Sequence, residues 1–199
     1  MNMTFKTPKE YQDNPDRYWE ARGGMNYLMS LPGYHNRSAR SQRVFFREII
    51  ERIDAKSLLD FGCGTGRFFD LWELCGLKEI FGYDRSQSQL DEARMLQTSA
   101  RLMWANGKVR NKIPYEDKQF DLVVACEVLP HVISEEITGM FYELHRVCRN
   151  RLAMVVSAPD HPMQFHSTHH DYDVLMGPLF LKIQDKIEGS YRFIEAEKK

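Results

Sequence analysis

Short apolar runs alternate with amphipathic stretches through most of this chain, and this alternation restricts the fold more than any other feature. The apolar runs are Ser57–Phe61, Ile80–Tyr83, Leu102–Ala105, Leu122–Ala125 and Leu152–Val156. The stretches with helical spacing that separate most of them are Arg67–Leu74, Gln87–Leu96 and Glu135–Val147. Wholly apolar strands that alternate with helices are typical of a parallel sheet covered on both faces. The sequence therefore predicts an α/β fold built on a doubly wound, mostly parallel sheet.

The two ends of the chain depart from this rhythm. Phe180–Glu188 and Tyr191–Glu197 flank Gly189-Ser190, a two-residue hairpin signal that predicts a C-terminal antiparallel hairpin. Near the N-terminus, Thr7-Pro8 can open a helix that continues through Trp19 to the glycines at 23 and 24. A second helix is expected over Ala39–Ile53, where apolar residues recur at helical spacing. Both helices form an N-terminal extension that precedes the sheet.

Length and charge limit the classes of protein to which the chain can belong. Its 199 residues predict one domain over 1–199, with a helical lid over 1–56 and the sheet-based core over 57–199. The net charge of −1 argues against a general nucleic-acid or membrane-surface binder. No apolar run approaches the roughly 20 residues of a membrane span, and the first residues lack a secretory signal. The four cysteines lack C-x-x-C spacing and suggest reduced thiols, so we expect a cytoplasmic protein.

The strongest motif is a strand that runs into three alternating glycines, Gly62, Gly64 and Gly66, directly after Asp60. Glycine lets the backbone turn sharply and lets a ligand lie against it without a Cβ in the way. A dinucleotide site requires G-x-G-x-x-G, whereas the spacing here is G-x-G-x-G with an acid before it. We expect Asp60 to face a crevice, where its carboxylate would suit a cationic group. The alternative is a tight strand–helix turn that binds no ligand.

A second acid follows the next apolar strand. Phe81-Gly82-Tyr83 ends in Asp84, 18 residues after Gly66. An acid at the end of a second parallel strand can accept hydrogen bonds from both hydroxyls of a ribose. The alternative is that Asp84 caps the helix that begins near Ser86.

These motifs resemble the class I S-adenosylmethionine (SAM)-dependent methyltransferases, in particular the small single-domain type that includes the quinone-biosynthesis methyltransferases. The resemblance covers roughly residues 58–159. It depends on four segments whose order and spacing agree with the family: Asp60–Gly66, Gly82–Asp84, Ile113–Val123 and Glu127–Val132. The resemblance implies a Rossmann-like sheet and SAM as the cofactor, with S-adenosylhomocysteine as the product.

The resemblance also implies roles for particular residues. The glycines would line the methionine part of SAM, Asp60 would lie near its amino group, and Asp84 would hold the ribose. Cys126 and Glu127 would lie beneath the methionine, and Asn106, or else Asn111, would accept a hydrogen bond from the adenine amino group. With two aromatic residues of the extension, the predicted cofactor-binding set is Tyr18, Trp19, Asp60, Gly62, Cys63, Gly64, Gly66, Asp84, Arg85, Asn106, Gly107, Cys126 and Glu127.

Aromatic residues are frequent in the N-terminal extension. Tyr11, Tyr18, Trp19 and Tyr27 could form a lid over the cofactor, and a ring there would favour the charge of the sulfonium. The alternative is that these rings only pack the extension against the sheet.

Histidines follow the fourth and fifth predicted strands, whose carboxyl ends face the ligand crevice of such a sheet. We expect His131, His166 and His169 to be the catalytic candidates, because an imidazole can act as general base for a hydroxyl acceptor near neutral pH. A divalent metal held by these histidines with Asp171 or Asp173 is one alternative, although we assign no metal ligand. An inert polar loop is the other.

Together these patterns predict methyl transfer from SAM to a small-molecule acceptor by in-line displacement, with no membrane partner. Two alternatives remain. One is a methyltransferase that acts on RNA or another macromolecule, and the other is a non-catalytic module that binds SAM or a nucleotide.

Overall fold

The described residues form one seven-stranded sheet. The computed structural model describes residues 14–22, 37–96, 112–164 and 166–199, and the backbone of 102–106. Strand order is β3-β2-β1-β4-β5-β7-β6. The strands are β1 (Ser57–Phe61), β2 (Glu79–Asp84), β3 (Leu102–Asn106), β4 (Phe120–Cys126), β5 (Cys148–Ser157), β6 (Phe180–Glu188) and β7 (Tyr191–Lys198).

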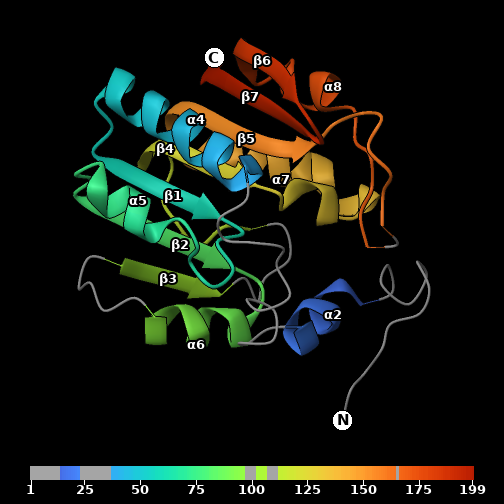
Figure 1. Cartoon of the computed structure of the whole chain (residues 1–199), viewed down its shortest axis with the longest axis horizontal. Coiled ribbons are helices and arrows are strands. Elements are labelled where there is room, and N and C mark those ends of the chain that lie inside the picture. The colour runs from blue at the N-terminus through green and yellow to red at the C-terminus, as the bar shows by residue number, and fades with distance from the viewer. Residues whose placement is uncertain (1–13, 23–36, 97–101, 107–111, 165) are drawn as a thin grey trace.

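Strands β1 to β5 all run parallel to their neighbours in the sheet: β3 pairs with β2, β2 with β1, β1 with β4, and β4 with β5. Strand β7 runs antiparallel to both of its neighbours, β5 and β6. The predicted doubly wound, Rossmann-like sheet with a C-terminal antiparallel hairpin is therefore confirmed. From β1 the chain winds outward through β2 to β3, then returns to place β4 on the other side of β1. Such a reversal opens a crevice at the carboxyl ends of the two central strands. Figure 1 shows the helix α2 off this edge of the sheet.

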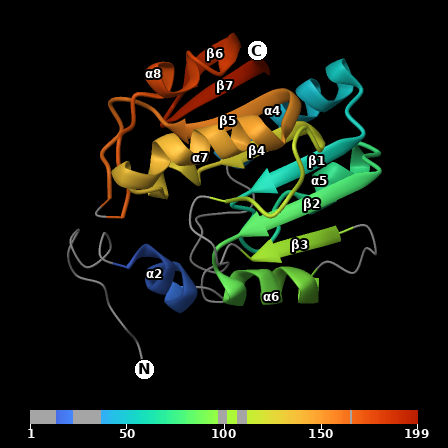
Figure 2. The same cartoon turned by 180° about the vertical axis from the view of Figure 1, so that it is seen from behind.

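Helices cover both faces of the sheet (Figures 1 and 2). They are α2 (Pro15–Arg22), α4 (Arg37–Ile53), α5 (Phe69–Leu74), α6 (Gln87–Leu96), α7 (Ser134–Val147) and α8 (Tyr172–Met176), with a 3₁₀ turn η1 (Leu129–His131). None of the helices in the described part of the chain has the length and apolar character needed to cross a bilayer.

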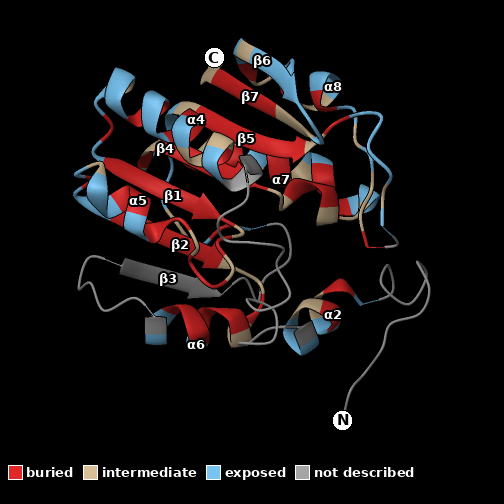
Figure 3. Ribbon diagram, viewed as in Figure 1, coloured by how far each residue is buried: buried red, intermediate tan, exposed pale blue. Residues whose placement is uncertain are grey.

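Two buried clusters, one on each face of the sheet, explain why the strands are apolar throughout. Leu58 packs in the cluster that holds α4 and α5, whereas its neighbour Leu59 packs in the cluster that holds α7. Successive side chains of a strand point to opposite faces, so a sheet covered on both sides needs apolar residues at every position. Figure 3 shows the resulting buried band through the central strands.

The starts of α2 and α5 show how local contacts decide where a helix begins. The described part of the first helix begins at Pro15, because the Asn14 side chain accepts a hydrogen bond from Arg17 N (3.1 Å) and caps it. The predicted start at Thr7 lies outside the described residues. The helix after the glycine loop begins at Phe69 instead of Arg67, because residues 64–68 form turns, in which Phe69 N donates to the carbonyl oxygen of Gly66 three residues before it (3.1 Å).

The short helix α8 has no counterpart among the predicted elements. Asp171 caps it, since its carboxylate accepts a hydrogen bond from Val174 N (3.0 Å). The aspartate that the sequence presented as a possible metal ligand therefore has a structural role.

Candidate functional site

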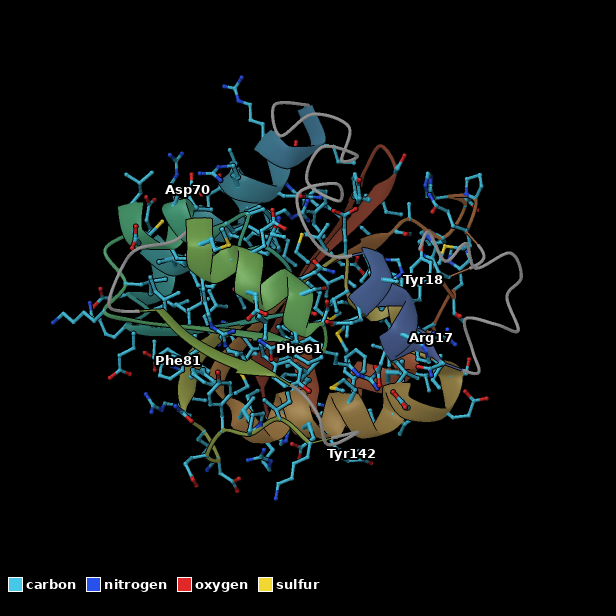
Figure 4. The ribbon with its side chains drawn as sticks, turned by 90° about the horizontal axis from the view of Figure 1, so that it is seen from below. Arg17, Tyr18, Phe61, Asp70, Phe81 and Tyr142 are labelled. Carbon is cyan, nitrogen blue, oxygen red and sulfur yellow. The ribbon has the colours of Figure 1, made fainter. Side chains whose placement is uncertain are left out.

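A cavity opens at the carboxyl ends of β1, β2 and β4. Three segments far apart in the sequence line it: the loop after β1, the end of β2 with the first turn of α6, and the turn after β4. Pro15, Asp16 and Trp19 of α2 complete the wall. In Figure 4, Tyr18 is labelled on α2 and Phe61 at the end of β1.

The glycine loop is held against β2 by its own backbone. The N–H groups of Gly62 and Cys63 both donate to the carbonyl oxygen of Tyr83, at 2.7 and 3.1 Å. Gly62 has φ = +72°, and a Cβ built on it would lie 2.2 Å from Cγ2 of Val128. A Cβ on Gly64 (φ = +55°) would lie 2.8 Å from the side-chain oxygen of Gln89. Packing against Val128 thus requires glycine at position 62, whereas at position 64 the end of the flexible Gln89 side chain can shift and the positive φ is what favours glycine.

Asp84 lies at the cavity and is fixed from two sides. Its Oδ2 accepts a hydrogen bond from Gly64 N and its Oδ1 accepts one from Ser86 N, each at 2.9 Å. Burial raises the pKa of this carboxyl, although the same N–H groups lower it. The hydroxyl oxygen of Ser86 accepts a hydrogen bond from Gln89 N (3.3 Å) in the first turn of α6. Ser86, and not Asp84, is therefore the N-cap residue of α6. Each Asp84 oxygen keeps a second lone pair for a ligand hydroxyl.

Asp60 does not line the cavity. Its side chain lies on the same face of β1 as Leu58, under α5, where it is 2% exposed and accepts a hydrogen bond from the Trp72 indole N–H (3.1 Å). Burial raises its pKa to about 7. The expectation that Asp60 faces the crevice is therefore corrected: strand alternation turns Phe61, and not Asp60, toward the cavity.

Glu127 sits in a strained turn after β4, with φ = +57°, and lines the cavity. Arg67 donates to its Oε2 at 2.7 Å and lies 3.2 Å from the Cys126 sulfur. Gln42 of α4 donates to the same oxygen at 3.3 Å, and Tyr191 of β7 adds another hydrogen bond. Burial would raise the pKa of Glu127, but the Arg67 charge and these hydrogen bonds outweigh it and hold the pKa below its usual value.

His131 lies on the side of the cavity that α2 closes, in contact with Trp19. Its Nδ1 is 2.9 Å from the carbonyl oxygen of His166 and 3.3 Å from Nδ1 of His166. The Trp19 ring meets the His131 ring edge to face (centroids 4.7 Å apart), and Tyr18 stacks on His166 (5.1 Å). A carbonyl oxygen can only accept, so Nδ1 of a neutral His131 carries the proton and Nε2 has the lone pair.

His169 lies apart from this cluster. Its ring is exposed, with Nε2 3.2 Å from the backbone oxygen of His161. Asp173 is paired with Lys182 and Arg192. Within the described part of the chain, no group of three or more histidine, cysteine or acidic side chains is placed to hold a metal ion.

Comparisons with known proteins point to the methyltransferases. Residues 59–155 match the family model described as a methyltransferase domain. A probable SAM-dependent methyltransferase of Mycobacterium tuberculosis is 26% identical over 121 residues, which are 61% of this chain and 42% of the relative. The segment that resembles a methyltransferase domain is thus just under half of this chain. The chain is also similar in fold to the N-methyltransferase NodS of Bradyrhizobium japonicum, solved with S-adenosylhomocysteine (TM-score 0.72, 13% identity, 94% of this chain and 99% of that one).

A second relative is the malonyl-[acyl-carrier protein] O-methyltransferase of Legionella pneumophila. It is 34% identical over 106 residues, which are 53% of this chain and 37% of the relative. The chain spans about two fifths of the length of these two curated relatives. The likeness to both relatives thus covers only part of each of them.

The structure brings most of the predicted site residues around one cavity. Those that line it are Trp19, Gly62, Cys63, Gly64, Asp84, Arg85, Cys126, Glu127 and His131. Those that the structure places outside its lining are Tyr18, Asp60, Gly66, His166 and His169. The side chain of Asn106, and all of Gly107 and Asn111, lie outside the described residues.

The sequence analysis missed four polar residues of the cavity wall: Asp16, Thr65, Arg67 and Gln89. Arg67 directly follows the last glycine of the motif, so the sequence could have placed it near the loop. Its ion pair with Glu127, 60 residues away, could not be predicted from the sequence. Gln89 lies in the first turn of α6, close behind Asp84 in the sequence. Asp16 pairs with Arg85 (2.8 Å), a contact between α2 and the end of β2 that no local pattern signals.

Proposed function

We propose that this chain binds SAM in the cavity at the end of β1 and transfers its methyl group to a small-molecule acceptor. The observation that supports this most is the position of Asp84, fixed beside the glycine loop at the point where the strand order reverses. A carboxylate held there by Gly64 N is suited to accept both hydroxyls of a ribose, whereas it would repel a pyrophosphate.

The other lining residues fit the remaining parts of SAM. The charged Glu127 suits the α-ammonium group, and Arg67 beside it suits the α-carboxylate. The Trp19 ring faces the cavity, where an aromatic surface favours a sulfonium charge. The α2 residues that close the wall would also exclude water during the reaction.

SAM supplies an activated methyl group on a sulfonium, so the protein mainly aligns the acceptor and excludes water. A hydroxyl acceptor must also lose a proton, and Nε2 of His131 is the basic nitrogen at this side of the cavity. His166 holds the His131 ring by its backbone oxygen. We propose His131 as the general base and His166 as the residue that orients it.

A small acceptor is favoured over a macromolecule because α2 closes part of the cavity and the chain has a net charge of −1. We also propose that residues 1–56 contribute the lid of a single catalytic domain, since α2 supplies cavity wall. The relation to the quinone-biosynthesis group stays a prediction.

Replacement of Asp84 by Asn should weaken SAM binding by about 1–3 kcal/mol, because the charged hydrogen bonds to the ribose are lost. Isothermal titration calorimetry with SAM and with 2′,3′-dideoxy-SAM measures this. We expect the wild type to prefer SAM and the Asp84→Asn variant to lose most of that preference. A wild type that binds both ligands equally would remove Asp84 from the ribose site.

Replacement of His131 by Ala should lower kcat by about 10²–10⁴-fold for a hydroxyl acceptor while the Kd for SAM stays within about twofold. His169→Ala is the matched control, because this exposed histidine lies outside the cavity lining. The measurement is turnover against a panel of small hydroxyl and amine compounds. Equal kcat values for the two variants on a hydroxyl acceptor would exclude His131 as the base.

A further inference from the structure

Glu20 of α2 makes a concentrated set of contacts with the start of α6, although it is exposed and does not line the cavity. Its carboxylate accepts from Ser88 N at 3.1 and 3.3 Å and from the Ser86 hydroxyl at 3.1 Å. Its backbone oxygen accepts from the Ser88 hydroxyl at 2.9 Å. Three donor groups of two core residues thus bond to one residue of the N-terminal extension, and the N–H of Ser88 is shared between both carboxylate oxygens.

These contacts continue into the cavity through a chain of hydrogen bonds. Ser86, which Glu20 holds by the hydroxyl, donates its N–H to Oδ1 of Asp84 (2.9 Å). The other oxygen of Asp84 accepts from Gly64 N (2.9 Å) in the glycine loop. The path from α2 to the glycine loop is therefore Glu20, Ser86, Asp84 and Gly64.

The physical effect of Glu20 on this path is that of a helix cap supplied by a distant part of the chain. The first N–H groups of a helix have no partner within the helix, and a carboxylate near them also interacts favourably with the helix dipole. In α6, the Ser86 hydroxyl satisfies Gln89 N and the Glu20 carboxylate satisfies Ser88 N. Without Glu20, Ser88 N loses its protein partner and the turn that carries Asp84 loses a restraint.

We propose that Glu20 is a positioning residue of the cofactor site: by capping α6 it holds Ser86, and through Ser86 it holds Asp84 in the orientation that binds the ribose. This inference depends on the proposed binding of SAM. According to this inference, α2 raises the affinity for SAM as well as covering the cavity. It does so through Glu20, which does not itself contact the ligand. Preorganised ligand groups bind more tightly because less conformational freedom is lost on binding.

A double-mutant cycle separates this role from simple anchoring of α2. In the otherwise wild-type protein, Glu20→Ala should weaken SAM binding by about three- to tenfold, and Glu20→Gln by less, because the amide oxygen still accepts a hydrogen bond. In the Asp84→Asn protein, Glu20→Ala should change the Kd by less than about twofold, since the ribose contact is already lost. Anchoring alone would give the same fold-change in both backgrounds.

Isothermal titration calorimetry of the full chain with SAM gives the four Kd values of the cycle, and circular dichroism confirms that each variant is folded. Glu73→Gln is the matched control, because this exposed carboxylate of α5 is remote from α2. Wild-type affinity in Glu20→Ala, or equal losses in both backgrounds, would overturn the inference and leave the proposed function intact. A wild-type protein that does not bind SAM would overturn both.

Discussion

Replacement of Gly62 by Ala should lower the free energy of unfolding by about 2–5 kcal/mol. The added Cβ would lie 2.2 Å from Cγ2 and 2.4 Å from Cβ of Val128, so the backbone of the turn after β4 would have to move. The positive φ of +72° adds strain for any residue with a Cβ. Urea denaturation, analysed with a shared slope, measures the loss.

Gly76 offers a control in which an added Cβ causes backbone strain at a positive φ but no steric clash. Its φ is +74°, nearly that of Gly62, but a Cβ there would meet nothing within 4 Å. Gly76→Ala should therefore cost only about 1–2 kcal/mol, from the backbone strain alone. If both variants lose the same stability, the contact between residue 62 and Val128 is not what requires glycine.

Replacement of Asp60 by Asn should stabilise the protein above neutral pH, by up to about 4 kcal/mol. Burial raises the pKa of Asp60 from 3.8 to about 7. Between these two values the folded protein holds a proton that the unfolded chain has lost, so the Asp60 contribution to stability falls as the pH rises from about 4 to 7 and stays low above it. Asparagine does not ionise, and its oxygen can still accept from Trp72.

The measurement is the urea midpoint of both proteins at pH 5, 6, 7 and 8, with the gain expected to grow across that range. Asp121→Asn gives a control of opposite sign. Hydrogen bonds from Lys56 N, Ser57 N and Arg149 outweigh the effect of burial and lower the pKa of Asp121, so its charge stabilises the fold at neutral pH. Asp121→Asn should destabilise at pH 7, and that loss should shrink as the pH falls through the pKa of Asp121. A pH-independent effect of Asp60→Asn would show that Asp60 does not ionise in this range.

The sequence was sufficient for features that short segments determine. Apolar strands, helical spacing and the Gly189-Ser190 turn predicted the sheet and its hairpin, and the spacing of the glycines predicted the loop that meets Asp84. The orientation of Asp60 was not predictable in this way. A strand buried on both faces has no polar side to mark which face a single acid occupies, so only the packing of Trp72 decides it.

Contacts between segments far apart in the chain could not be predicted from the sequence either. Arg67 and Glu127 are far apart in the chain, and so are Glu20 and Ser88, yet both pairs form hydrogen bonds at the cavity or its edge. Similarly, the sequence placed His131 and His169 at the same edge of the sheet. Only the structure shows that His131, in η1 after β4, lines the cavity, whereas His169, in the loop after β5, is exposed.

The position of β7 between β5 and β6 has a consequence for dissecting this protein. Phe193 and Ile194, adjacent in β7, belong to the two separate buried clusters on opposite faces of the sheet. A fragment cut to the residues that match the family model would end at Val155 and lose both side chains. In such a fragment the edge of β5 would have no partner strand, and the buried clusters on both faces of the sheet would be exposed to solvent. Both changes favour aggregation over folding. The smallest autonomous folding unit therefore extends well past the homologous segment, into β7.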